Sequence, residues 1–272
     1  MFIRKLETVD AFVAVDLADV SGTGTARLAP KILQGGARDM ARSITYALAS
    51  LQRHETGISA GINSKPESRS DAAAAFATEV ADWDATFSLS PGKGVEAGEL
   101  GRIEAPPNDH VLAVGAVAAA TATMPAATTA AVIGGSDDLR SELASANITV
   151  IADDDPISAH VDLLFCGSKM GAIDHLVAAR LDCSVVVPTG PLPLTARAVA
   201  VCRQRGILAL PDFVTTCGPL IEDSSLVADT VSAIIGEVLE HPDGPLLGAC
   251  ERAEEFLATW QENLPFGRPM AP

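Results

Sequence analysis

The stretches VDLLFCG (161–167) and CSVVVPTG (183–190) decide the fold class of this chain. Both are apolar at nearly every position, as strands are when helices cover both faces of their sheet. Three more apolar runs and three segments of helical character alternate with them, in the order 129–135, 137–146, 147–155, 172–181, 195–204 and 206–212. This alternation predicts a parallel, doubly wound α/β domain of the Rossmann type.

The first third of the chain predicts a different, α+β organisation. Residues 10–16, DAFVAVD, alternate like a strand. The glycines and threonines of 21–25 predict a turn, which leads into a second strand or loop at 27–33. Residues 37–51 place apolar side chains three and four positions apart, so they predict a helix with one buried stripe, followed by a glycine-bearing turn.

A glycine-rich segment separates these two patterns. Residues 90–101 carry four glycines and one proline, so we place the connection between domains there. We expect an N-terminal α+β domain of substrate-binding or oligomerisation type at 1–100, a Rossmann-like domain at 101–245, and a C-terminal helix and tail at 246–272. The Ala/Val-rich segment 111–127 predicts a buried helix.

Composition excludes several classes of protein. With 35 acidic and 19 basic residues the formal net charge is −16, which disfavours binding to nucleic acid or to anionic membranes. The charged N-terminus and the short apolar runs predict neither secretion nor a membrane span. Five scattered cysteines without metal-ligand spacing predict no metal site and suit a reducing cytoplasm, which is the expected location.

Three blocks of sequence resemble the glutamate/leucine/phenylalanine/valine dehydrogenases, and the glutamate branch is the nearest. The block at 35–62 is similar to the family's helix and glycine turn, and PGKGVEAGELGRIEA at 91–105 is similar to its TGKP…GGSxGRxEATG linker. The block at 161–218 resembles VDILIPAALENxI…GANGPTTPEA…RGxxxxPDxxANAGG. The resemblance covers nearly the whole chain and implies an oligomeric, NAD(P)-dependent amino-acid oxidoreductase.

The catalytic groups that this resemblance implies do not stand at their positions. The family uses one lysine to hold the substrate carboxylate and a second lysine, beside an aspartate, for proton transfer; these lysine positions hold Ala47 and Ser59. The Pro-Asp dipeptide that carries the aspartate does not occur between Ile62 and Pro91. An anionic substrate needs a cation and imine chemistry needs an acid/base group, so the sequence predicts no catalytic residue.

The cofactor-binding turn also departs from its usual pattern. Gly134, Gly135 and Ser136 follow the first strand in place of GxGxxG, and Asp153 stands near the position of a ribose-binding acid. These four residues are the candidates for binding a dinucleotide. Because two carboxylates follow at 137–138 and would repel a pyrophosphate, we expect no cofactor, with NAD or NADP left as the alternative.

Five further residues are candidates for lining a cleft: Lys93, Cys166, Lys169, Pro191 and Thr216. Pro191 and Thr216, with Gly171, occupy positions where the family motifs carry asparagine. Cys166 follows an apolar strand, so the assignment as a core thiol is favoured over one in the cleft. If the site has been rebuilt for other chemistry, the candidates to carry it are Lys169, Cys166, Cys217, Ser59 and Lys93.

Taken with the resemblance, these observations predict a dehydrogenase-like protein without catalysis. It would act by binding a small ligand or as a non-catalytic subunit of an active partner, in a homo-oligomer or a hetero-oligomer. Two alternatives stay open: an enzyme with a rebuilt site, and an NAD(P)-dependent amino-acid oxidoreductase of altered specificity.

Overall fold

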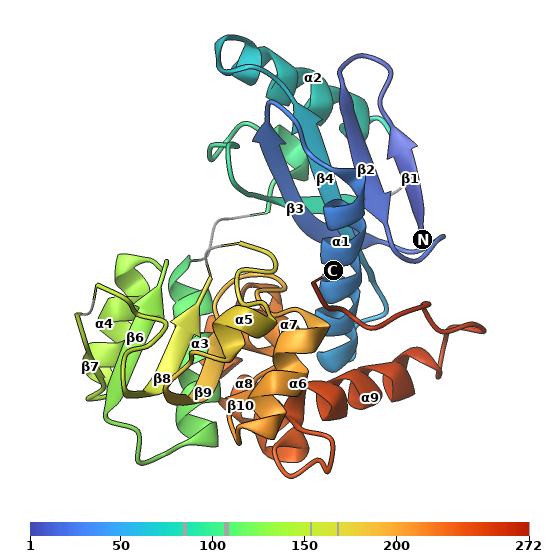
Figure 1. Cartoon of the computed structure of the whole chain (residues 1–272). Coiled ribbons are helices and arrows are strands. Elements are labelled where there is room, and N and C mark those ends of the chain that lie inside the picture. Colours follow the sequence, from blue (N-terminus) through green and yellow to red (C-terminus); the bar gives the residue numbers. More distant parts are fainter. Residues whose placement is uncertain (84–85, 106–108, 153, 168, 272) are drawn as a thin grey trace. The chain divides into compact units, whose positions relative to one another are not determined.

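The computed structural model describes residues 1–83, 86–105, 109–152, 154–167 and 169–271 (Figure 1). The chain forms two compact units, each with its own five-stranded sheet. Unit 1 comprises Met1–Pro107 and Leu257–Pro269, and unit 2 comprises Asn108–Phe256 and Met270–Pro272. Among the described residues, no helix is both long and apolar enough to cross a lipid bilayer.

Unit 1 is built on a mixed sheet of order β1-β2-β4-β3-β5. Its strands are β1 Phe2–Lys5, β2 Ala11–Val15, β3 Gly22–Ala29, β4 Thr56–Asn63 and β5 Phe87–Pro91. Strands β1 and β4 pair antiparallel with β2, while β4 and β5 pair parallel with β3. Two helices cover the sheet, α1 at Gln34–Ser50 and α2 at Arg69–Ala81.

The strands send alternate side chains to these two helices. On one face Ile58 of β4 packs with Phe76 of α2 in a fully buried core. On the other face Phe12 of β2 packs with Ala41 of α1. Because side chains alternate along a strand, every polar residue of β3 and β4 that points away from α2 lies on the α1 face.

Two segments that the sequence predicts as turns are strands. The stretch 21–25 leads into β3, and the glycine-bearing turn expected after α1 is β4. The glycines serve close packing: a Cβ at Gly24 would lie 1.8 Å from the carbonyl oxygen of Ile58, and one at Gly57 would lie 2.0 Å from that of Ala41. Glycine therefore lets backbones approach each other here, and both turn predictions are wrong.

Unit 2 is built on an all-parallel sheet of order β10-β9-β8-β6-β7, which confirms the predicted Rossmann-like fold. Its strands are β6 Thr129–Ile133, β7 Thr149–Val150, β8 Val161–Cys166, β9 Cys183–Pro188 and β10 Leu208–Ala209. From β6 the chain first adds β7 on one side and then adds β8, β9 and β10 on the other side, so the strand order switches between β6 and β8. In folds of this kind ligands bind at that switch point, beyond the carboxyl ends of the strands.

Helices cover both faces of this sheet. They are α3 Asp109–Thr123, α4 Asp137–Ser145, α5 His175–Ala178, α6 Ala196–Gln204, α7 Asp212–Thr215, α8 Val227–Val238 and α9 Pro245–Leu257. Helices α5 and α6 contribute to one core with β8 and β9, whereas α3 packs against β9, α4 and α8. Burial of α3 confirms the prediction for 111–127.

One predicted helix is much shorter than expected. The segment 172–181 contains only α5, because the Asp174 side chain accepts hydrogen bonds from the backbone N–H groups of Leu176 and Val177 and so fixes the start of the helix. The helix ends after one turn, and the chain enters β9 at Cys183.

The segment after α9 returns to unit 1, where a buried ion pair holds it. Arg42 on α1 donates from Nε and Nη2 to the Asp16 carboxylate at 2.7–2.9 Å, and Nη1 donates to the carbonyl oxygens of Phe266 and Gly267. The Asp16 side chain is completely buried. A single guanidinium thus joins α1, the residue that follows β2, and residues late in the chain.

Candidate functional site

The predicted cofactor turn lies at the switch point of unit 2. Gly134 and Gly135 both have positive φ, 70° and 127°, and Ser136 caps α4 by accepting from the N–H of Leu139 at 3.3 Å. The glycines are required for this backbone, and the cap starts the helix. Asp137 and Asp138 occupy the first turn of α4, where an anionic ligand would meet the helix dipole. The fourth candidate, Asp153, lies outside the described residues.

Cys166 is next to this turn, because Ile133 and Cys166 are paired in register at the ends of β6 and β8. It is 1% exposed, and burial, followed by the nearby thiol of Cys183, raises the pKa of Cys166 well above its ordinary value. A Cβ at Gly167 would lie 2.4 Å from Oγ1 of Thr189 on the next strand end. The strand ends are therefore packed directly against each other, and the thiol is a core group.

The remaining candidates of unit 2 do not form one cluster of polar groups. Lys169 and Pro191 are exposed, and the half-buried Thr216 hydroxyl donates to the carbonyl oxygen of Asp212, four residues back, at 2.7 Å. The buried carboxylate of Asp212 accepts from the N–H of Leu192 at 2.9 Å, and Leu192 has a positive φ of 52°. Asp212, which the motif comparison singled out only as part of Pro-Asp, thus fixes an unusual loop backbone.

In unit 1 the two residues that the resemblance assigns to the lysine positions are closed to solvent. Ala47 on α1 is 4% exposed, and Ser59 on β4 is 0% exposed. The Oγ of Ser59 is buried and has no hydrogen-bond partner among the described residues. Lys93 is exposed on the turn after β5, and its carbonyl oxygen accepts from the N–H of Leu28 at 2.9 Å.

The structure adds one residue that the sequence analysis missed, Arg27 on β3. Its side chain is half-buried, and burial lowers the pKa of the guanidinium from its ordinary value. Nε and Nη2 are both shielded from solvent, and neither has a hydrogen-bond partner in the part of the chain that the structure describes. Unpaired buried donors are rare, so a site of this kind calls for an explanation.

Strand register places Arg27 and Ser59 diagonally across from each other on neighbouring strands. In the parallel ladder Thr25 is opposite Ser59 and Arg27 is opposite Gly61. Because side chains alternate along a strand, all four residues face the same side of the sheet. The signal in the sequence was the alternation of polar residues in GTGTARLA, in which every second residue is polar up to Arg27. It was missed because the first half of this strand was read as a turn.

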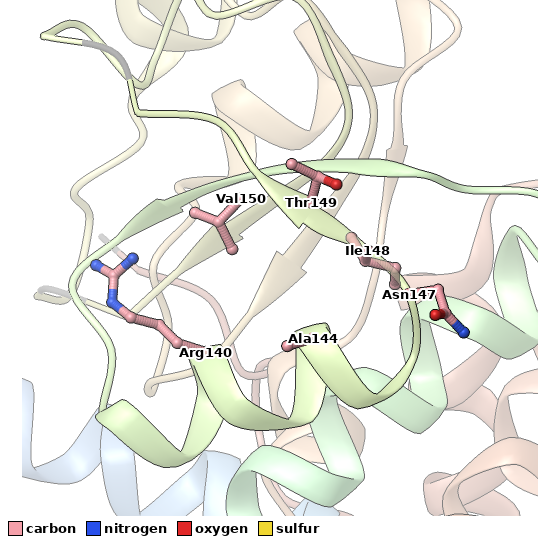
Figure 2. Close-up of a pocket in the computed structure, with 6 residues that line it drawn as sticks. All are labelled: Arg140, Ala144, Asn147, Ile148, Thr149 and Val150. Atoms are coloured by element: carbon pink, nitrogen blue, oxygen red, sulfur yellow. The ribbon is translucent and has the colours of Figure 1, made fainter.

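A hollow of about 510 Å³ lies elsewhere, at the outer edge of the unit 2 sheet (Figure 2). Figure 2 shows Arg140 and Ala144 on α4, across from the segment 147–150 that leads into the edge strand β7. The hollow contains no residue that the sequence singled out. Among the described residues, no group of three or more His, Cys, Asp or Glu side chains is arranged to hold a metal ion.

Comparison with known proteins gives the fold. No family model matches the sequence, and neither does any curated protein. Solved structures do match: L-tryptophan dehydrogenase from Nostoc punctiforme aligns with a TM-score of 0.70 at 17% identity, over 95% of each chain. A hetero-hexameric glutamate dehydrogenase from Thermus thermophilus, in its leucine-bound form, aligns with a TM-score of 0.75 at 16% identity, over 94% of this chain and 86% of that one.

Glutamate dehydrogenase from Plasmodium falciparum aligns with a TM-score of 0.72 at 11% identity, over 92% of this chain and 79% of that one. The chain therefore has the fold of amino-acid dehydrogenases over nearly its whole length.

Proposed function

We propose that this chain is a non-catalytic protein with the fold of the amino-acid dehydrogenases, and that it acts by binding a small ligand. The observation that carries the proposal is the state of the two lysine positions: Ala47 and Ser59 are neutral and almost completely buried. A hydroxyl without an activating base cannot replace a lysine in proton transfer. The fold has been kept while the groups that the family reaction needs are missing from these positions.

The dinucleotide side of the fold supports the same proposal. Two carboxylates, Asp137 and Asp138, lie at the start of α4. A bound pyrophosphate would accept hydrogen bonds from the helix N–H groups at this place. A complete dinucleotide-binding sheet has three strands on each side of its switch point, whereas the described residues supply only β6 and β7 on one side. We infer that no dinucleotide binds.

A partner subunit fits this function. The hetero-hexameric glutamate dehydrogenase from Thermus thermophilus is built from more than one kind of subunit and has leucine bound. An assembly of this kind gives a non-catalytic subunit a role, because ligand binding on one subunit can shift a conformational equilibrium that its neighbours share. We propose the same arrangement here, with homo-oligomers as the alternative.

Turnover assays test the proposal. The purified protein is mixed with each common amino acid and NAD or NADP, and with each 2-oxo acid, ammonium and NADH or NADPH. Because several charged groups are missing, we expect a rate at least about 1,000-fold below that of an active amino-acid dehydrogenase assayed alongside as control. Turnover with any ordinary pair of substrates would show that the proposal is wrong.

Nucleotide binding without reaction is a separate possibility, favoured by the two positive-φ glycines before α4. Thermal unfolding with and without a millimolar dinucleotide decides it, since a ligand far above its dissociation constant stabilises the folded state. We expect NAD and NADP to change the melting temperature by less than about 1 °C. A clear rise with either would place a nucleotide on this protein and would contradict the inference drawn from Asp137 and Asp138.

A further inference from the structure

The guanidinium of Arg27 presents two N–H donors, Nε and Nη2, that are unpaired among the described residues and could form a bidentate ion pair with a carboxylate. Nε and Nη2 lie on the same edge of the planar group, and both lack an acceptor in the described structure. Two parallel N–H groups at this edge match the two oxygens of a carboxylate. Leaving them unpaired and shielded from water costs free energy, and burial already lowers the pKa of the group.

Ser59 supplies a third donor on the same side of the sheet. Its hydroxyl is completely buried and has no partner among the described residues, and its strand neighbour Thr25 is two residues from Arg27 along β3. The Thr25 hydroxyl is already occupied, because it donates to the carbonyl oxygen of Ser90 at 3.2 Å. Arg27 and Ser59 therefore have three unpaired polar groups between them.

The turn after β5 lies against Thr25 and Arg27. A Cβ at Gly92 would lie 2.6 Å from Oγ1 of Thr25 and 3.1 Å from Cγ of Arg27. Only glycine leaves Thr25 and Arg27 undisturbed at this point. The two β3 side chains are therefore held at a fixed place beneath the turn.

We propose that Arg27 and Ser59 bind the carboxylate of a small ligand, a deepening that rests on the proposed binding function. One guanidinium edge and one hydroxyl suit a planar monoanion; a phosphate, with more charge and more oxygens, needs further donors. The site differs from the carboxylate-binding lysine position of the resembling family, since Ala47 is on α1 and Arg27 is on β3. Because the two nitrogens are shielded, the covering atoms must move before the ligand enters.

Melting temperature measured with carboxylates tests this site. The probes are sodium acetate, propionate, glycine, L-leucine and L-glutamate at 10 mM, each compared with sodium chloride and sodium phosphate at equal ionic strength. We expect at least one carboxylate to raise the melting temperature by several degrees, about 5 °C if 10 mM is 100 times its dissociation constant. Failure of every carboxylate to exceed chloride would overturn the proposal and would leave ordered water as the partner of Arg27.

Two variants then assign the effect to this site. Arg27→Met should remove the carboxylate-dependent rise, while Arg38→Met, which removes an exposed arginine of the same unit, should keep it. Ser59→Ala should weaken binding several-fold yet leave the ligand-free melting temperature unchanged or higher, since it deletes an unpaired buried hydroxyl. A rise that persists in Arg27→Met would place the ligand elsewhere and would overturn the assignment.

The two tests fail independently. Binding is measured without dinucleotide, so a negative result here leaves the absence of turnover untouched. Turnover in the assay would in turn refute the non-catalytic function without changing the effect of Arg27→Met on carboxylate binding.

Discussion

Replacement of Arg42 by methionine is expected to lower the free energy of unfolding of unit 1 by about 3–5 kcal/mol. The variant leaves the Asp16 carboxylate fully buried without its ion-pair partner and frees the carbonyl oxygens of Phe266 and Gly267. Removing one partner of a buried ion pair costs more free energy than the intact pair contributes to stability, because the remaining charge is neither solvated by water nor paired with an opposite charge. Urea unfolding followed by circular dichroism measures the change.

The double variant Asp16→Leu with Arg42→Met is the matched control. It removes both charges and should recover much of the loss. Arg38→Met, on the same helix but exposed, should change the free energy of unfolding by less than about 0.5 kcal/mol. If Arg42→Met were as mild as Arg38→Met, the ion pair would have no part in holding the late segment to unit 1.

Alkaline pH is expected to destabilise unit 2 strongly through its buried thiols. Burial raises the pKa of Cys202 to about 11 and that of Cys217 to about 12, and it raises the pKa of Cys166 further. These groups keep their protons in the folded state and lose them in the unfolded state once the pH exceeds about 9. Their contribution is complete below that pH and is lost as the pH rises towards 11–12.

Each of these three thiols, and likewise Cys183, whose pKa is also raised to about 12, should lower the free energy of unfolding by about 1.4 kcal/mol per pH unit in that window. Urea unfolding at pH 8, 9, 10 and 11 gives the slope. The triple variant Cys166→Ala, Cys202→Ala, Cys217→Ala should be less stable at pH 8 but should show a flatter slope. The single variant Cys183→Ala removes only one thiol, whose pKa burial also raises to about 12, and should therefore keep most of the slope. An unchanged slope in the triple variant would mean that other groups cause the alkaline loss.

The same shifts bear on the rival function, an enzyme with a rebuilt site. A nucleophilic cysteine needs a lowered pKa and access to solvent. Cys166 and Cys217 have raised pKa values and exposures of 1% and 0%. Neither thiol is suited to attack a substrate in this structure, which favours binding over covalent catalysis as the proposed function.

The fold of unit 2 could be predicted from the sequence because helices bury both faces of its sheet. When helices cover both faces, β8 and β9 are apolar at nearly every position, and that pattern can be recognised without knowledge of the fold. Burial of α3 was predicted for the same reason: few of its side chains are polar. The four-residue length of α5 was not predictable from periodicity, because a cap at Asp174 and the entry into β9 decide it.

Unit 1 was harder because its glycines look like turn residues. In β3 and β4 they permit contacts between backbones that are distant in the sequence, such as Gly24 with Ile58. Such a contact leaves no local pattern. Arg27 was missed as a consequence, since its pairing with Gly61 and its side of the sheet follow only from the strand register. The positions of Ala47 and Ser59 came from the resemblance, and their roles remain predictions.

The path of the chain also sets an order of events during synthesis. Residues of unit 1 come first, those of unit 2 follow, and Phe266 and Gly267 emerge only after nearly all of unit 2 has been made. Until then Nη1 of Arg42 has no carbonyl partners from that segment. Unit 1 is therefore the first part of the protein to be synthesised, yet these buried contacts of Arg42 can form only after most of unit 2 has been translated.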